Sequence, residues 1–391
     1  HMNTAEALQP VSQSFDSILE ILQQGVADAV FPGAVLRVGH KGRLLCELGV
    51  GYKSVKLAKG DQPSEMTLDT VFDVAELTQQ VVTVTIIMKL VELGKLQLDD
   101  QVLRYVQGFG VLGKSPITMR HLLTHASGLA QSDNFFEKLV QLNSTSRMGI
   151  LTSRGARDYV YNSIKRAEIK YKPGAQYLKS ELGFILLGEV AELLSGFTLD
   201  KACFRFVTKA LGLKSTSFVD LSMIKRRGIH PITDLIAPTE QCTWRKRLLC
   251  GEVADDNSWA MGGISGSCGL FTNVHELYLF ANEILASFYA YSDFVDSGVV
   301  REFWTERDAG ACSPWHYGWD SPSEENGMQN SGLSDRAVGN NGTTGCSLWI
   351  DPERALVITL MSNCTHPTRN NKKIKGFRSK LVQQLVEIVD S

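Results

Sequence analysis

Residues 72–94 read FDVAELTQQVVTVTIIMKLVELG, and this stretch decides the fold. From Thr78 to Leu93, apolar side chains recur on almost every side of a helix, and Gly94 then provides a natural helix end. A helix that is apolar nearly all round belongs in the middle of a large core. The sequence therefore predicts a buried central helix with the rest of the chain packed around it.

The two ends of the chain are predicted to form strands. After a helical apolar pattern over residues 15–22, Pro32-Gly33 interrupts the periodicity. Apolar runs then predict strands at residues 34–39, 43–48, 344–349 and 356–361. The first two strands form a hairpin around Lys41-Gly42. These strands indicate one sheet that is built from both ends of the chain.

The middle of the chain is predicted to be helical. Residues 118–285 show helix and loop patterns, including a long amphipathic helix over residues 182–194 that Gly196 closes, and a further helix covers residues 375–389. This order indicates an α+β fold, with a mainly antiparallel sheet flanked by helices and an additional all-helical lobe. We therefore predict one unit over residues 1–391. Its α/β lobe takes about residues 3–115 and 265–391, and its helical lobe about residues 116–264.

Composition places the chain among globular proteins. Of its 391 residues, 43% are hydrophobic and 21% are charged, which excludes a wholly disordered chain. The formal net charge is −2 and no basic run stands out, so we expect no nucleic-acid partner and no binding to anionic membranes. No apolar stretch reaches the roughly 18 residues that span a bilayer, so no transmembrane segment is predicted.

Cysteine usage and the N-terminal residues bear on the compartment. The eight cysteines are scattered, without a CxxC pair or a nearby His at zinc-ligand spacing, and we expect mostly buried free thiols. His1-Met2 is interpreted as a cloning remnant. Residues 5–26 lack a basic start followed by an apolar core, so no signal peptide is predicted in this sequence. These features favour a reducing, cytoplasmic compartment.

Three motifs that could carry chemistry have simpler explanations. His121 and His125 lie four residues apart, but HLLTH lacks the acidic residue that follows the first His in zinc proteases, so His125 is predicted to cap or pack. The one strict SxxK, Ser222 to Lys225, sits in a charged segment and is interpreted as coincidence. Residues 263–269, GISGSCG, do not satisfy GxSxG and are predicted to form a glycine-rich loop. No metal and no cofactor are therefore predicted.

Longer motifs spread along the chain carry a family resemblance. Residues 117–129 read ITMRHLLTHASGL, Pro173-Gly174 precedes LGFILLG at residues 182–188, and residues 345–352 read GCSLWIDP. In these segments the chain resembles the serine β-lactamase and penicillin-binding-protein-like superfamily, especially its class C-like esterase and D-aminopeptidase branch. The resemblance covers nearly the whole length and implies a β-lactamase/transpeptidase-like fold. It also allows a periplasmic location.

The catalytic motifs of that superfamily are degenerate here. The resemblance places SxxK at the start of the core helix, Tyr-x-Asn or Tyr-Ser-Asp before the LLG helix, and Lys-Thr-Gly or His-Thr-Gly on the strand beside the site. In this chain they read Glu76-Leu77-Thr78-Gln79, Lys179-Ser180-Glu181 and Asn340-Asn341-Gly342. A fourth family segment, Val-His-Asp-Glu-Asn, appears as residues 253–257 with Ala254 at the His position. Thr343 and Thr344, which follow the third motif, are candidate ligand-binding residues.

These substitutions remove the usual reaction. Acyl transfer needs an activatable hydroxyl or thiol, a base and an oxyanion hole. A Glu76 carboxylate would give a mixed anhydride more reactive than the substrate, Gln79 cannot act as a base, and Asn340 supplies no cation. Only the backbone oxyanion hole could survive. The resemblance implies that Glu76 and Lys179 face each other, which predicts an ion pair that fills the former reaction centre.

Two functions of different classes follow. The first is a pseudoenzyme that acts as a binding or scaffold module, with a peptidoglycan fragment, peptide or partner protein as candidate ligand by resemblance. The second is a hydrolase or transferase with altered chemistry, in which Glu76, Lys179 and Glu181 act as acid and base groups because they could shift one another's pKa values. An open pocket would favour the second function, and a satisfied ion pair would favour the first.

Overall fold

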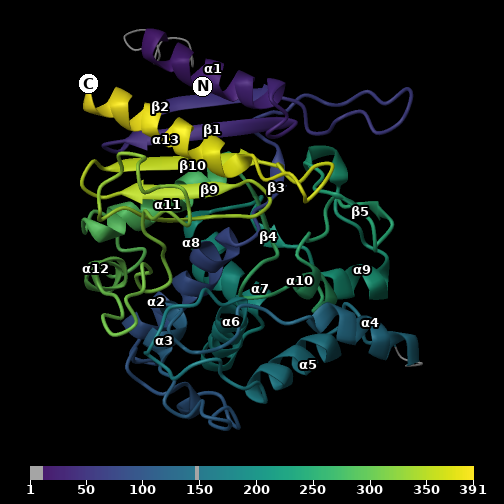
Figure 1. Cartoon of the computed structure of the whole chain (residues 1–391), viewed down its shortest axis with the longest axis vertical. Coiled ribbons are helices and arrows are strands. Elements are labelled where there is room, and N and C mark those ends of the chain that lie inside the picture. The colour runs from purple at the N-terminus through teal and green to yellow at the C-terminus, as the bar shows by residue number, and fades with distance from the viewer. Residues whose placement is uncertain (1–11, 146–148) are drawn as a thin grey trace.

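A five-stranded antiparallel sheet joins the two ends of the chain in the computed structural model, which describes residues 12–145 and 149–391 (Figure 1). Its order is β2-β1-β10-β9-β8. The strands are β1 (Gly33–His40), β2 (Arg43–Gly51), β8 (Val338–Asn341), β9 (Ser347–Asp351) and β10 (Leu356–Ser362). The predicted α+β fold with one sheet from both chain ends is confirmed. Residues 1–11 lie outside the described residues. They include His1-Met2 and the start of residues 5–26, for which no signal peptide was predicted.

Helices cover both faces of this sheet. They are α1 (Ser12–Ala27), α11 (Val274–Phe288) and α13 (Ile374–Asp390). α1 and α13 pack together, whereas α11 packs against β1 and β10 (Figure 1). Along β1, Leu36 and Val38 join the apolar cluster of α1 and α13, and Val35 joins the cluster that contains α11. Because neighbouring side chains of a strand point to opposite faces, this alternation fixes the register of β1.

The predicted central helix is present, but it begins as a π-helix. Residues Gln79–Val84 form the π-helical segment η1, and α2 (Thr85–Glu92) continues it. Gly94 follows with a φ of 72° and ends the helix as predicted. Within η1 the Thr83 hydroxyl donates to the Gly266 carbonyl at 2.7 Å, so polar contacts across the core accompany the wider turns. Such π-helical turns recur at functional sites.

A helical region lies beside the sheet (Figure 1). Its longest helix, α6, confirms the predicted helix, and Gly196 caps it in the left-handed conformation. The amphipathic character was wrong, because residues 182–191 are all buried. No single helix among the described residues is long and apolar enough to cross a membrane, although α6 and the bent segment after it (Leu199–Leu211, turned by 74°) pass the length and composition test as a pair. The remaining helices of at least five residues are α3 (Met119–Leu123), α4 (Phe135–Thr145), α5 (Arg154–Lys165), α6 (Glu181–Ser195), α7 (Leu199–Cys203), α9 (Leu221–Arg227), α10 (Asp256–Ala260) and α12 (Ser297–Thr305).

Short strands in this region were not predicted. They are β3 (Val71–Asp73), β4 (Ser217–Phe218), β5 (Gln241–Cys242), β6 (Arg247–Leu248) and β7 (Leu270–Asn273). The helix-and-loop prediction for residues 118–285 was wrong at four of them, because strands of two to four residues carry too little periodicity to detect. β3, β7 and β4 form a small antiparallel sheet in the order β3-β7-β4. This sheet fixes the chain just before Glu76.

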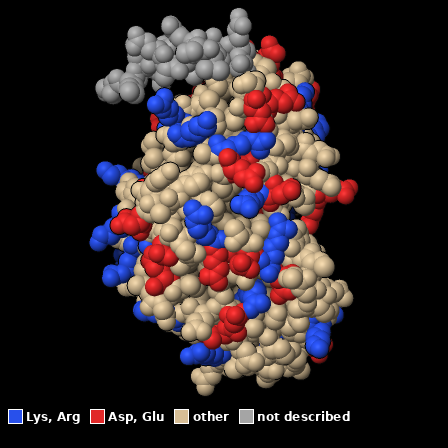
Figure 2. Space-filling model, turned by 90° about the vertical axis from the view of Figure 1, so that its left-hand side faces the viewer, with Lys and Arg blue, Asp and Glu red and all other residues tan. Residues whose placement is uncertain are grey.

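Both signs of charge are mixed on the surface. On the face drawn in Figure 2, basic and acidic side chains lie side by side and no large area carries one sign alone. The mixture agrees with the net charge of −2. This face therefore lacks the basic field of a nucleic-acid platform.

Candidate functional site

The three degenerate motifs meet at the start of the core helix. Glu76 precedes η1, Glu181 opens α6, and Asn340 lies on the edge strand β8. The Asn340 side-chain amide donates to the backbone carbonyl of Glu76 at 3.4 Å. The negative charge of Glu76 adds to the increase that burial causes in the pKa of Glu181. The structure thus brings together the positions that the resemblance singled out.

A buried carboxylate holds the turn that presents Glu76. Asp73, at the end of β3, accepts the backbone N–H of Ala75 at 2.9 Å and that of Ala254 at 2.7 Å. Ala75 has a φ of 49°, a left-handed conformation that these contacts stabilise. Burial raises the pKa of Asp73 to about 6 in spite of the two hydrogen bonds. Asp73 therefore ties the site to the residue that replaces the family's His.

The Glu76 carboxylate is held by the turn after β8. Its Oε2 accepts the backbone N–H of Thr343 at 2.8 Å and the Thr343 hydroxyl at 3.1 Å. Gly342 permits this approach, because a Cβ there would lie 2.5 Å from the Val74 carbonyl oxygen. An acyl oxygen carried on residue 76 would need a backbone donor at this place. The carboxylate of Glu76 already occupies the Thr343 donor, so this part of the predicted oxyanion hole is filled by the chain itself.

Neutral amides occupy the positions of the family's cations. Gln79 is buried and donates from Nε2 to the Ser267 hydroxyl at 3.2 Å. Asn340 is buried and donates to Gln80 Oε1 at 3.0 Å. Neither amide can accept a proton from a nucleophile near neutral pH. Gln79 now links the core helix to the loop at Ser267, and Asn340 links the same helix to β8.

The remaining β8 residues have structural contacts. Asn341 donates to the Asn326 carbonyl at 3.2 Å and accepts from the Trp349 indole at 3.1 Å. The buried Thr344 hydroxyl donates to the Asp73 carbonyl at 2.7 Å. Of the two candidate ligand-binding threonines, only Thr343 is exposed.

The predicted ion pair between Glu76 and Lys179 is wrong. Within residues 12–145 and 149–391, no ion pair within 4.0 Å joins these side chains. The Lys179 ammonium instead lies 5.6 Å from the centre of the Trp315 ring, a cation–π contact. Burial raises the pKa of nearby Asp320 to about 6, and the charge of Lys179 partly opposes this shift. Glu76 finds its partner in a backbone N–H, which the sequence pattern does not reveal.

Glu181 belongs to a carboxyl pair that the sequence did not predict. Its Oε2 accepts from the Asn257 amide at 3.3 Å, whereas its Oε1 is buried and has no hydrogen-bond partner among the described residues. Burial raises the pKa of Glu181 well above its usual range, and the charges of Asp255 and Glu76 raise it further. Asp255, which caps α10 through Ser258 N, lies close enough to hydrogen-bond with Glu181 when one of them carries a proton. The only sequence signal for Asp255 was its place in the altered family segment, residues 253–257.

These groups line a cavity of about 300 Å³. Glu181 and Asp255 lie on its wall together with Thr343 and Thr344, and Lys372 contributes an exposed ammonium group. Three larger cavities, of about 490, 770 and 810 Å³, lie away from the degenerate motifs. We take the cavity of about 300 Å³ as the candidate site, because Glu181 and Ala254 from the altered family segments line it next to Thr343, the partner of Glu76.

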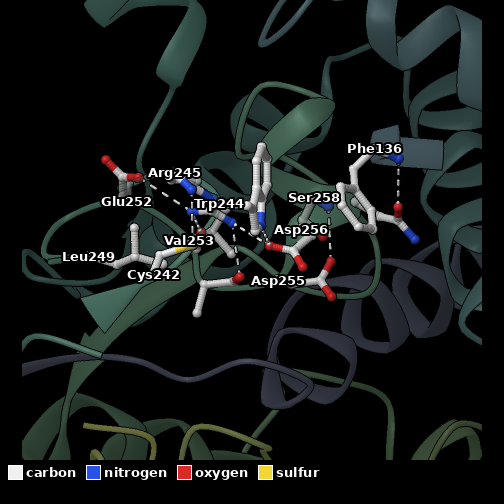
Figure 3. A network of polar contacts seen from close by, with 12 residues as sticks. Phe136, Cys242, Trp244, Arg245, Leu249, Glu252, Val253, Asp255, Asp256 and Ser258 are labelled. Atoms are coloured by element: carbon white, nitrogen blue, oxygen red, sulfur yellow. Dashed lines mark hydrogen bonds and ion pairs between the residues drawn. The ribbon is translucent and has the colours of Figure 1, made fainter. Parts of the chain in front are cut away.

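A network behind the cavity neutralises its other carboxylates (Figure 3). The buried Arg245 guanidinium donates to Asp256 at 3.0 Å and to the Val253 carbonyl at 2.9 Å, and the Trp244 indole donates to the same Asp256 oxygen at 3.0 Å. Arg369 pairs with Asp256 at 3.0 Å and also with Glu240. Ion pairs and hydrogen bonds from Arg245 and Arg369 therefore hold the segment around residue 255 in place.

The SxxK match at Ser222–Lys225, His125 and the glycine-rich residues 263–269 have structural roles. The Ser222 hydroxyl donates to Asp220, and Lys225 donates to backbone carbonyls of residues 149 and 151, so this SxxK match is structural. His125 accepts the Ser180 N–H at 2.9 Å and packs against the Trp315 ring, as predicted. Residues 263–269 form a loop. Among the described residues, no group of three or more His, Cys, Asp or Glu side chains is placed to hold a metal.

The cysteines are free thiols, as predicted. All eight lack a disulfide, and all except Cys250 and Cys312 are buried. Burial raises the pKa of Cys46, Cys203 and Cys346 to about 12. These three thiols stay protonated near neutral pH, and a protonated thiol is a weak nucleophile.

Comparison with known proteins settles the family. The sequence model of the Beta-lactamase family matches residues 18–382. The chain belongs to the β-lactamase family. It is 26% identical over 375 residues to a protein of Salmonella typhi described as a "Putative D-alanyl-D-alanine carboxypeptidase", over 90% of this chain and 83% of that protein. The same values hold for the protein of that description in Salmonella typhimurium.

Solved structures share the β-lactamase fold. EstCE1, a hydrolase with promiscuous acyltransferase activity, matches with a TM-score of 0.71 at 17% identity, over 96% of this chain and 99% of that chain. Simvastatin synthase (LovD) from Aspergillus terreus matches with a TM-score of 0.71 at 16% identity, over 95% and 98% of the two chains. The predicted β-lactamase/transpeptidase-like fold is confirmed, while the limits of the two lobes stay a prediction.

Proposed function

We propose that this member of the β-lactamase family is a binding protein that does not form an acyl-enzyme. The observation that carries the proposal is the contact of Glu76 with Thr343. The side chain at the nucleophile position is a carboxylate, and it occupies a backbone N–H that an acyl oxygen would need. A site of this kind can hold a ligand without attacking it.

The neighbouring positions support the same proposal. Gln79 and Asn340 are neutral, buried and hydrogen-bonded, so the cleft has no base beside residue 76. The Lys179 amine faces Trp315 and Asp320 instead. The cavity beside Glu181 has room for a small-molecule or peptide-like ligand.

A labelling experiment tests the proposal. The protein is incubated with a penicillin and with a fluorophosphonate, and its intact mass is measured, with a serine β-lactamase as positive control. We expect the mass to stay unchanged, because no activated hydroxyl faces the cleft. A stoichiometric adduct on Ser180, Ser267 or another hydroxyl near Glu76 would overturn the proposal.

A second function, hydrolysis or group transfer by altered chemistry, is favoured by the outcome of the pocket criterion: among the described residues the ion pair of Glu76 with Lys179 is absent, and a cavity lies beside Glu181. The carboxyl pair in that cavity favours it as well. Glu181 and Asp255 can share a proton, and such a pair can act as acid and base. Lys179, the third group in this hypothesis, does not join the pair. Turnover of ester or amide substrates that Glu181→Gln abolishes would support this second function over the first.

A further inference from the structure

The candidate cavity has unbalanced negative charge. Its lining carboxylates are Asp133, Glu181, Glu240, Asp255 and Asp256. Asp133 is paired with Lys138 at 3.0 Å, and Glu240 and Asp256 are paired with arginines. Among the described residues, no Lys or Arg side chain lies within 4.0 Å of the Glu181 or Asp255 carboxylate. The Lys372 ammonium lines the same cavity but lies more than 4.0 Å from both carboxylates, so Glu181 and Asp255 have no paired cation.

One carboxylate oxygen of this pair, the buried Glu181 Oε1, has no hydrogen-bond donor among the described residues. Buried polar groups are nearly always hydrogen-bonded, because leaving one unpaired is costly. A proton shared with Asp255 can satisfy the pair, but two ionised carboxylates cannot satisfy each other. A positively charged hydrogen-bond donor in the cavity could therefore bind Glu181 Oε1 and the Asp255 carboxylate.

We propose that the cavity binds the ammonium group of a small amine ligand, held by Glu181 and Asp255. This inference rests on the proposed function, since it names the ligand class of the same site. An ammonium group offers three donors and one positive charge, so it can replace the shared proton and contact both carboxylates. The volume of about 300 Å³ leaves room for an organic body behind the charge, and the Phe136 ring lines the same cavity. A bare metal ion fits less well, because only two free carboxylates converge.

A matched pair of fragments tests the charge. Benzylamine and benzyl alcohol share one ring and one shape, and their affinities are measured by calorimetry near neutral pH. We expect benzylamine to bind at least about tenfold more tightly, as charge-assisted hydrogen bonds are worth more than neutral ones. Equal affinities, or no binding of benzylamine, would overturn the proposal.

Variants locate the effect. Glu181→Gln keeps the size of the side chain and removes its charge, so the preference for benzylamine should disappear. Glu20→Gln makes the same change at an exposed position on α1, and the preference should remain. If Glu181→Gln leaves the preference intact, the ammonium does not bind at this pair. Stoichiometric binding of Ca²⁺ that competes with benzylamine and needs Glu181 would also contradict the proposal, because it would identify a metal site.

The pH dependence gives a second readout. Glu181 faces Asp255, Glu76 and the neutral Asn257, and its raised pKa means that an ammonium must displace a proton. Affinity for benzylamine should therefore rise with pH as Glu181 loses its proton, with proton release on binding, and this slope should flatten in Glu181→Gln. Affinity that falls with pH would refute the mechanism. An acyl adduct in the labelling experiment would overturn the proposed function alone, since amine selectivity would still be decided by the fragments.

Discussion

The contact between Glu76 and Thr343 can be measured by a double-mutant cycle. Glu76→Ala removes the carboxylate, and Thr343→Ala removes the hydroxyl that donates to it at 3.1 Å while leaving the backbone N–H in place. A hydrogen bond to a charged group is worth about 1.5–3 kcal/mol when buried. Thr343 is exposed and Glu76 is half-buried, so water screens this bond and competes for both groups. We therefore expect a coupling free energy of about 0.5–1.5 kcal/mol.

A matched cycle uses the pair that the sequence favoured. Glu76→Ala combined with Lys179→Ala should give a coupling below about 0.5 kcal/mol, because Lys179 contacts Trp315 and the two charges do not pair. Free energies of unfolding are measured in urea at constant pH by tryptophan fluorescence and by circular dichroism, whose transitions must coincide for the cycle to hold. A coupling above about 1 kcal/mol for Glu76 with Lys179, and none for Glu76 with Thr343, would refute the reasoning.

Two further predictions follow from the same geometry. The family's residues are restored by four substitutions, Glu76→Ser, Gln79→Lys, Lys179→Tyr and Asn340→His. A fluorophosphonate should label this fourfold variant in an intact-mass assay, whereas Glu76→Ser alone should stay unlabelled because it lacks a base. Full labelling of the single variant would contradict this account. Gly342→Ala should lower the free energy of unfolding by about 1–3 kcal/mol, because its Cβ would meet the Val74 carbonyl oxygen at 2.5 Å. The control Gly376→Ala, in α13 with nothing within 4 Å of the new Cβ, should be neutral or stabilising by up to about 1 kcal/mol, and equal losses at both glycines would argue against the contact.

Those parts of the fold that depend on long patterns were predictable from the sequence. The hairpin of β1 and β2 and the helix α6 carry apolar patterns that end at glycines, and α13 carries a helical apolar pattern. The π-helical start of the core helix was not predictable, since it depends on contacts such as that of Thr83 with Gly266. β3 and β7 were missed because strands so short are defined by their partners across the sheet.

The site shows a similar division. Family motifs placed Glu76, Glu181 and Asn340 near one another, and the structure brings them together. The actual partners of these side chains depend on groups that a motif does not show. Glu76 binds a backbone N–H, which every residue type but proline carries, so its position follows from the turn geometry at Gly342. The pairing of Glu181 with Asp255 joins segments more than 70 residues apart.

The substitutions reverse the sign of charge that the site can accept. Relative to the family motifs, the cations expected at positions 79 and 340 are replaced by neutral amides, and a carboxylate, Glu76, stands at the nucleophile position. The one added cation, Lys179, is directed to Trp315 and Asp320. A ligand carboxylate entering the cavity would therefore meet Glu181 and Asp255, which no cation pairs, while the one unpaired lining cation, Lys372, is exposed to water that screens its charge. Like charges at close range repel strongly where burial limits screening. Benzoate should bind more weakly than benzyl alcohol, the reverse of the order expected for a site that keeps the family's cations, and Glu181→Gln should narrow that difference.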